Sequence, residues 1–164
     1  MSWRIQQALK GRSKMGQSLT KNYIHIIFST KYRQPFIHPT IESELYSYLG
    51  GICNQLECKP IKIGGWFDHV HILCMLSKKI TLVNLLEELK SHSSKWIKTK
   101  DESLENFYWQ RGYGAFSVTP SEVDSLILYI QNQKQHHQTT TFQTEYLSIL
   151  KKYHAEYDER FIWD

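Results

Sequence analysis

The sequence has 164 residues, of which 41% are hydrophobic, so it can form one well-packed domain but not two full ones. Its formal net charge of +4 fits a nucleic-acid partner but does not select one. No apolar run approaches the roughly 20 residues that a membrane span requires. The three cysteines have neither the spacing of a zinc knuckle nor that of a redox pair. We therefore expect a cytoplasmic protein with no membrane partner.

Positive charge is concentrated in the middle of the chain. Residues 59–100 contain eight lysines and three acidic residues, whereas residues 142–164 contain three basic and five acidic residues. This distribution predicts that the central segment forms a basic surface.

Hydrophobic periodicity predicts the order of strands and helices. The first 14 residues are polar and basic, and we expect them to be an appendage to a single domain that spans residues 15–164. β-branched and aromatic runs predict strands at 23–30, 59–67, 69–77 and 115–118. Apolar residues at helical spacing predict helices at 39–56, 81–98, 120–137 and 142–153. This order predicts an α+β fold, the ferredoxin-like split β-α-β arrangement with an antiparallel sheet and additional C-terminal helices.

The third predicted strand contains the motif His69-Val70-His71. Residues two apart on a strand face the same side, so the two imidazoles lie about 7 Å apart at Cα and can ligate one ion. Val70, Ile72 and Cys74 then face a helix-covered core on the other side. The pair alone is also typical of two histidines on a half-buried strand.

Two other chemistries use a His-x-His pair, and the sequence disfavours both. A metallo-β-lactamase-type site continues with Asp-His, whereas Ile72-Leu73 follows here. An amidohydrolase barrel needs roughly 250 residues, which is more than this chain has.

The third predicted helix carries Tyr129, Gln133 and His137 at successive intervals of four residues. This spacing places a phenol, an amide and an imidazole along one stripe of the helix. Packing of Tyr129 at the edge of the neighbouring apolar arc is the alternative interpretation. Leu73 and Met75 share the sheet face of the two histidines, so apolar surface should cover that face. A docked helix that carries Tyr129 would provide this cover.

Together these features resemble the single-tyrosine HUH transposases of small bacterial insertion sequences, in which HUH stands for histidine, hydrophobe, histidine. The resemblance runs from about residue 15 to the C-terminus. It is carried by the segments YIHIIFSTKYRQPFI (23–37), WFDHVHIL (66–73), LKSHSSKWI (89–97), GYGAFSV (112–118), YIQNQ (129–133) and YDERFIWD (157–164).

The resemblance implies a metal-dependent tyrosine DNA strand transferase in the bacterial cytoplasm. Such an enzyme cleaves and rejoins single-stranded DNA with imperfect hairpins at element ends, through a 5′-phosphotyrosine intermediate. His69 and His71 match the metal ligands, Tyr129 the nucleophile and Gln133 the third ligand. The ion is expected to be Mg²⁺ or Mn²⁺. The resemblance further implies a homodimer in which one subunit's tyrosine helix completes the other's metal site, and no small-molecule substrate.

The DNA surface is expected on the second helix, where long cations alternate with small residues that permit close approach to phosphates. The candidate DNA-binding residues are Lys90, Ser94, Lys95, Lys98 and Arg111.

Several residues have no single assignment from the sequence. Trp66, Trp109 and Tyr113 are either base-stacking residues or part of the core. His136 and His137 match no role in the motif and are expected to contact DNA or solvent.

Three other functions stay open at this point: a domesticated palindrome-associated nicking transposase, a non-catalytic module that binds hairpin DNA, and a metal-dependent phosphoesterase that uses water. The joint presence of His69, His71, Tyr129 and Gln133 argues against a decayed, non-catalytic site. Trapped covalent DNA on the protein would exclude both the module and the phosphoesterase.

Overall fold

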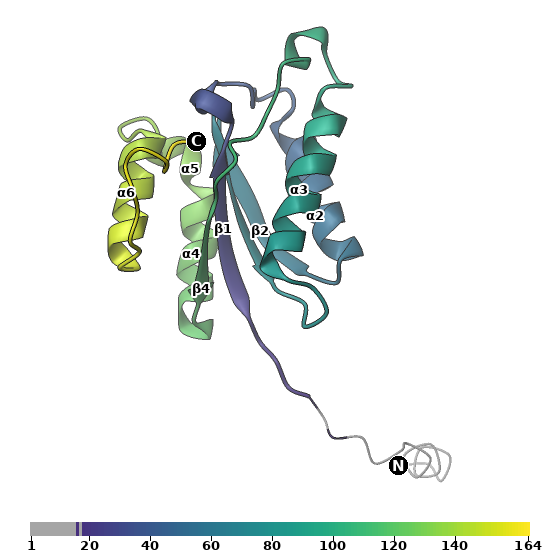
Figure 1. Ribbon diagram of the computed structural model, residues 1–164, viewed down its shortest axis with the longest axis vertical. Helices are drawn as coiled ribbons and strands as arrows, with labels where there is room; N and C mark the ends of the chain where they lie inside the picture. Colours follow the sequence, from purple (N-terminus) through teal and green to yellow (C-terminus); the bar gives the residue numbers. More distant parts are fainter. Residues whose placement is uncertain (1–15, 17) are drawn as a thin grey trace.

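Four antiparallel strands form the centre of the structure, a computed structural model that describes residues 16 and 18–164 (Figure 1). They are β1 (Tyr23–Ser29), β2 (Lys59–Trp66), β3 (His69–Met75) and β4 (Gly114–Val118), in the sheet order β2-β3-β1-β4. Each neighbouring pair is antiparallel, which confirms the predicted ferredoxin-like arrangement. The appendage expected at residues 1–14 lies outside the described residues.

Two helices, α2 (Glu42–Gln55) and α3 (Leu82–Ile97), cover one face of the sheet (Figure 1). The Thr81 side chain caps α3 by accepting a hydrogen bond from the Asn84 backbone N–H at 3.2 Å. The core beneath these helices contains Val70, Ile72 and Cys74 of β3, as the alternation along that strand predicted. No helix in residues 18–164 is both long and apolar enough to cross a membrane.

The remaining helices, α4 (Val123–Gln131), α5 (Gln133–His136) and α6 (Phe142–Lys152), lie on the opposite face (Figure 1). Leu73 of β3 is buried in a cluster with Val118 and Ile130, and Tyr129 packs against it. Ile27 of β1 is buried against α6 in a second cluster. The helix that carries Tyr129 therefore covers the histidine-bearing face, as predicted.

The third predicted helix is divided rather than continuous to about His137. It begins with a short 3-10 turn, η3 (Pro120–Glu122), and α4 then ends at Gln131, because the next residue, Asn132, has a φ of −94° and a ψ of 15° that are not helical. Asparagine competes for backbone hydrogen bonds and has low helix propensity, which accounts for the break at this residue. Two further 3-10 turns, η1 (Lys31–Arg33) and η2 (Glu102–Leu104), lie in the connections.

A glycine in β2 lets α4 approach the sheet closely. A Cβ atom at Gly64 would lie 2.8 Å from the carbonyl oxygen of Ile130 and 2.9 Å from its Cγ2. Gly64 is also the β2 partner of His71 in the sheet. The close approach therefore sets the distance between α4 and the sheet next to His71 of β3.

Gly64→Ala should destabilise the protein by about 1–3 kcal/mol, because the new methyl group meets the α4 backbone rather than a flexible side chain. Thermal denaturation measures this effect. The matched control is Gly51→Ala on the exposed side of α2, where nothing lies within 4 Å. This control should stabilise the protein by about 0.5–1 kcal/mol, because alanine replaces glycine inside a helix. Equal stability of the Gly64 variant and the wild type would contradict the close packing of α4.

Candidate active site

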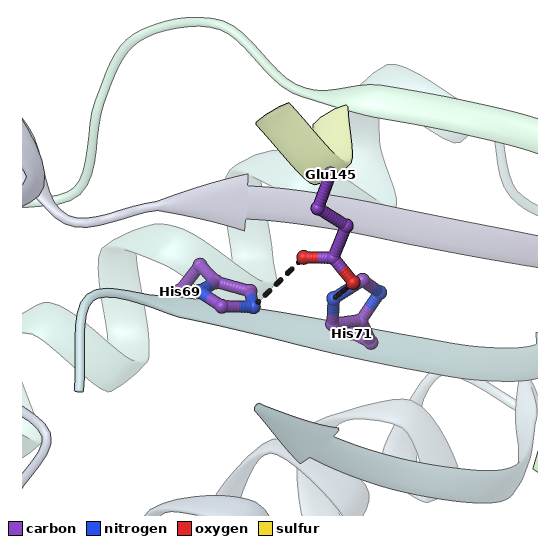
Figure 2. Close-up of side chains that lie close together, drawn as sticks. All are labelled: His69, His71 and Glu145. Carbon is purple, nitrogen blue, oxygen red and sulfur yellow. Dashed lines mark ion pairs between the residues drawn. The ribbon is translucent and has the colours of Figure 1, made fainter. Parts of the chain in front are cut away.

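Two completely buried histidines, His69 and His71, project from β3 toward α6 (Figure 2). The Nδ1 atom of His69 lies 2.7 Å from Oδ1 of Asp68, and the Nδ1 atom of His71 lies 2.9 Å from Nε2 of His25. Partners at Nδ1 hold each ring in one orientation, as the hydrogen-bond partners of metal-ligating histidines do. Both Nε2 atoms are consequently directed at the same space above the strand.

The two histidines differ in their electrostatics. Burial alone would lower the pKa of His69, but its hydrogen bonds with Asp68 and Glu145 raise that pKa to about 9. Burial lowers the pKa of His71. The Nε2 atom of His71 lies 3.4 Å from a Glu145 oxygen, yet it has no hydrogen-bond partner among the described residues. A buried nitrogen without a partner is costly, and it suits a metal ligand.

Tyr129 and Gln133 reach the same centre from α4 and α5. The Tyr129 hydroxyl donates a hydrogen bond to Glu145, and the tyrosine ring lies 5.8 Å from the ring of His71. Oε1 of the buried Gln133 lies 3.0 Å from Nε2 of His69, while its Nε2 donates to Glu145 at 2.9 Å. The structure thus brings together the four residues that the sequence singled out.

Glu145 of α6 lies at the middle of the site, although the sequence analysis did not select it. Its side chain is buried, and its oxygens lie 3.3 Å from Nε2 of His69 and 2.9 Å from Nε2 of His137. Burial alone would raise the pKa of Glu145, but its contacts with His137, His69 and His71 hold it far below the ordinary value. The sequence did contain a signal for this residue, because the charged Glu145 interrupts the apolar stripe of α6 next to Tyr146.

His137 and His136 complete the surroundings of this carboxylate. His137 donates from Nδ1 to the carbonyl oxygen of Thr140 at 2.6 Å, and its Nε2 lies 3.0 Å from Oε1 of Gln133. Nε2 of His136 is buried, lies 3.7 Å from Glu145 and has no hydrogen-bond partner in the described part of the chain. Neither histidine is therefore simply a solvated residue.

The ligand atoms are close enough to hold a metal ion. The donor atoms of His69, His71 and Glu145 all lie within 4.8 Å of one another, and so do those of His136, His137 and Glu145. Imidazole nitrogens with amide or carboxylate oxygens form a donor set that suits divalent transition ions.

Comparison with known families gives this arrangement a context. The family model described as "Transposase IS200 like" matches residues 18–133, which include the histidine pair, Tyr129 and Gln133. The chain belongs to the IS200-like transposase family. His136, His137 and Glu145 lie beyond the matched residues. No protein of curated function matches the sequence.

Two solved structures are similar in fold. The crystal structure of a candidate transposase from Deinococcus radiodurans has a TM-score of 0.58 and 21% identity, over 74% of this chain and 98% of that chain. A REP-associated tyrosine transposase bound to a REP hairpin has a TM-score of 0.54 and 12% identity, over 77% of this chain and 74% of that chain. At these identities the likeness supports the α+β fold of this transposase.

Lys90, expected at the DNA surface, is engaged within the transposase itself. Its Nζ donates hydrogen bonds of 2.6–3.0 Å to the carbonyl oxygens of Gln110, Arg111 and Gly112. Burial lowers the pKa of Lys90 to about 8, whereas the three carbonyl oxygens favour its charged form. Lys90 thus holds the segment that leads into β4.

The other predicted DNA-binding residues lie on α3 or just before β4, away from the helices that carry the tyrosine. Lys95 and Arg111 are exposed, and Ser94 is half-buried. Nζ of Lys98 lies 3.6 Å from the ring centre of Tyr108. Ser94, Lys95 and Lys98 border the sheet face opposite to α4 and α6, so a DNA strand that contacts both regions must pass around the sheet.

The three aromatic residues that the sequence assigned to neither the core nor base stacking differ in how deeply they are buried. Trp109 belongs to the core, where it contacts Phe28 edge-on at 4.8 Å between ring centres and donates from Nε1 to Ser93 at 2.9 Å. Trp66 and Tyr113 are half-buried. Of the three, Trp109 is therefore a structural residue.

Without metal, protonated His69 should stabilise the transposase in a pH-dependent manner. Folding raises its pKa from the ordinary 6.5 to about 9, so this contribution is complete below pH 6.5 and is lost as the pH rises through 9. In the presence of a chelator, the wild-type Tm should fall over this range. His69→Gln should remove that part of the slope. An identical pH slope in the two proteins would contradict the role of His69.

Proposed function

We propose that this transposase cleaves and rejoins single-stranded DNA at hairpin-bearing element ends through a 5′-phosphotyrosine intermediate on Tyr129. One observation supports this proposal above the others. The Tyr129 hydroxyl, the Gln133 amide oxygen and the imidazoles of His69 and His71 meet in one buried centre, although His71 and Tyr129 are more than 50 residues apart in the sequence. This combination supplies both a nucleophile and ligands for an ion.

His69, His71 and Gln133 are the proposed ligands of a divalent ion. The buried Nε2 of His71, which has no hydrogen-bond partner in residues 18–164, supports this assignment, as does the approach of the Gln133 oxygen to His69. Mg²⁺ prefers oxygen ligands, while imidazole suits Mn²⁺ at least as well, so either ion is expected to support cleavage. When bound, the ion acts as a Lewis acid toward a non-bridging phosphate oxygen.

Tyr129 performs the covalent step in this proposal. Its phenol gives up its proton as the oxygen forms a bond to phosphorus, the bond from phosphorus to the 3′ oxygen breaks, and the leaving 3′ oxygen takes up a proton, so no net proton is consumed. The DNA 5′ end remains on the tyrosine. The phosphotyrosine conserves bond energy, so attack by a 3′-hydroxyl reverses the step and rejoins DNA without ATP.

The resting state keeps the tyrosine hydroxyl protonated and oriented. Burial raises the pKa of Tyr129 and the charge of Glu145 raises it further, while the hydroxyl donates to that carboxylate. Because the pKa of Glu145 is held so low, this carboxylate orients the hydroxyl but is a weak proton acceptor.

A groove between α4 and α6 gives DNA access to the tyrosine. It has a volume of about 500 Å³ and contains Leu126, Tyr129, His136 and Lys152 in its lining. Lys152 is exposed at this groove, where its Nζ lies 3.7 Å from a carboxylate oxygen of Glu122 in the same lining.

A basic and aromatic strip at the end of β1 extends the proposed DNA path. We call Lys31, Tyr32, Lys98, Tyr108 and Arg111 the edge surface. Tyr32 is 67% exposed and Tyr108 is 53% exposed, so both can stack on unpaired bases. Tyr32 also adopts a φ of 57°, a conformation that few residues other than glycine occupy. With Lys95 on α3, the edge surface carries the proposed contacts to DNA.

The edge surface lies next to the metal ligands. The backbone N–H of Lys31 donates to the carbonyl oxygen of Tyr108 at 2.7 Å. The neighbouring Thr30 N–H donates to the carbonyl oxygen of Asp68 at 2.8 Å, and Asp68 precedes His69. A strand bound along the edge surface is thereby led from the α3 side toward the site.

A homodimer that exchanges tyrosine helices remains part of the proposal through the family resemblance. The apolar sheet face around Leu73, which also motivated a dimer, is covered by α4 of the same chain. The structure of a single chain thus has its tyrosine helix docked on its own sheet.

Tyr129→Phe should abolish the covalent protein–DNA adduct while leaving hairpin binding nearly unchanged, because only the nucleophilic oxygen is lost. Labelled hairpin single-stranded DNA is incubated with the protein and Mn²⁺, and denaturing electrophoresis detects the adduct. Tyr157→Phe, a change at an exposed tyrosine, is the matched control and should form adduct normally. Adduct formation by the Tyr129 variant would refute the nucleophile.

The double substitution Tyr32→Ala and Tyr108→Ala should weaken binding to single-stranded DNA by about tenfold or more, since a stacked base contributes about 1–3 kcal/mol. Both side chains are exposed, so Tm should change little. Fluorescence anisotropy at fixed salt measures affinity, with Leu128→Ala, at an exposed position of α4, as the control. Unchanged affinity of the double variant would remove the edge surface from the DNA path.

A further inference from the structure

The Glu145 carboxylate is placed as a shared acceptor for the groups that the proposed reaction uses. It is 3% exposed, and its Oε1 accepts hydrogen bonds from the Tyr129 hydroxyl and from Nε2 of Gln133. Its Oε2 lies 2.9 Å from Nε2 of His137. Figure 2 shows the carboxylate descending from α6 to the two rings on β3.

The distances from Glu145 to the two β3 histidines match those between ligands of one ion. Oε2 lies 3.3 Å from Nε2 of His69, and Oε1 lies 3.4 Å from Nε2 of His71. Two ligand atoms that each bind one ion at 2.0–2.2 Å lie about 3.0–3.5 Å apart. The contact with His71 lies at ion-pair distance, but Nε2 of His71 has no hydrogen-bond partner among the described residues and so is free to bind an ion.

We propose that Glu145 is an anionic ligand of the ion held by His69, His71 and Gln133, and that α6 thereby forms part of the metal centre. This inference rests on the proposed function, because it assumes that ion. The three other ligands are neutral when bound, so Glu145 supplies the only negative charge in this ligand set. A ligand set that combines a carboxylate with imidazoles suits Mn²⁺ and similar divalent ions.

Packing holds the carboxylate in this position. Phe142 stacks on the ring of His69, with 4.6 Å between ring centres and 26° between planes. Tyr146 and Leu150 are buried with Ile27 of β1. The α6 residues that surround Glu145 are therefore anchored to the sheet. A ligand on a packed helix loses little freedom when the ion binds, which favours affinity.

A different role for Glu145 gives the opposite effect on metal affinity. If the carboxylate only neutralises protonated His69 in the metal-free state, it must be displaced when the ion enters. Its removal would then leave metal affinity unchanged or increase it. A ligand role requires a decrease, so the sign of the change distinguishes the two roles.

The experiment measures Mn²⁺ binding to the full chain by calorimetry for wild type, Glu145→Gln and Glu159→Gln. The glutamine at 145 keeps the size of the side chain and removes its charge, and Glu159 is an exposed carboxylate that serves as the matched control. We expect the Glu145 variant to bind Mn²⁺ about 10- to 100-fold more weakly and the control to bind like the wild type. The visible spectrum of the Co²⁺-loaded protein should also change in Glu145→Gln, because a ligand is replaced rather than a distant charge.

Circular dichroism establishes whether Glu145→Gln is folded. If it is not, Glu145→Asp, which keeps the charge but shortens the side chain by one methylene, takes its place, and weaker Mn²⁺ binding is again expected. Unchanged or tighter binding by the folded variant, or an unchanged Co²⁺ spectrum, overturns the ligand role while the proposed function stands. Absence of Mn²⁺ binding by the wild type overturns the metal centre itself and this inference with it.

Discussion

The catalytic half of this protein is organised around a buried negative charge. A carboxylate removed from water is costly unless charged or hydrogen-bonding groups surround it. Glu145 meets this requirement through partners on β3, α4 and α5 and at His137 beyond α5. None of these elements can move independently without leaving the carboxylate short of a partner. The mutual placement of the tyrosine hydroxyl, the amide and the imidazoles follows from this shared constraint.

Periodicity was sufficient to predict the fold and half of the site. The alternation along β3 placed His69 and His71 on one face, because the side-chain period of a strand is fixed by its geometry. The interval from Tyr129 to Gln133 likewise placed both side chains toward the same centre, even though the helix breaks at Asn132. In both cases the relevant residues are close in the sequence, so local geometry determines their relation.

Long-range packing determined what periodicity did not reveal. Glu145 becomes a site residue only because α6 folds back over β3, and the amphipathic pattern of that helix does not specify which sheet face it covers. Lys90 was expected to bind phosphates, but the segment before β4 passes over it and presents three carbonyl oxygens. A charged residue on a helix cannot be assigned to solvent or to a partner until the neighbouring loop is placed.

The order of the elements along the chain has a consequence for synthesis on the ribosome. All four strands are complete at Val118, and both β3 histidines are in place by then. The proposed nucleophile Tyr129, the amide of Gln133 and the central carboxylate of Glu145 all follow, between residues 129 and 145. A nascent or prematurely terminated chain that ends before Tyr129 therefore contains the residues of all four strands but lacks the proposed nucleophile. In the proposed function, the capacity to join DNA is thus confined to chains translated past Tyr129.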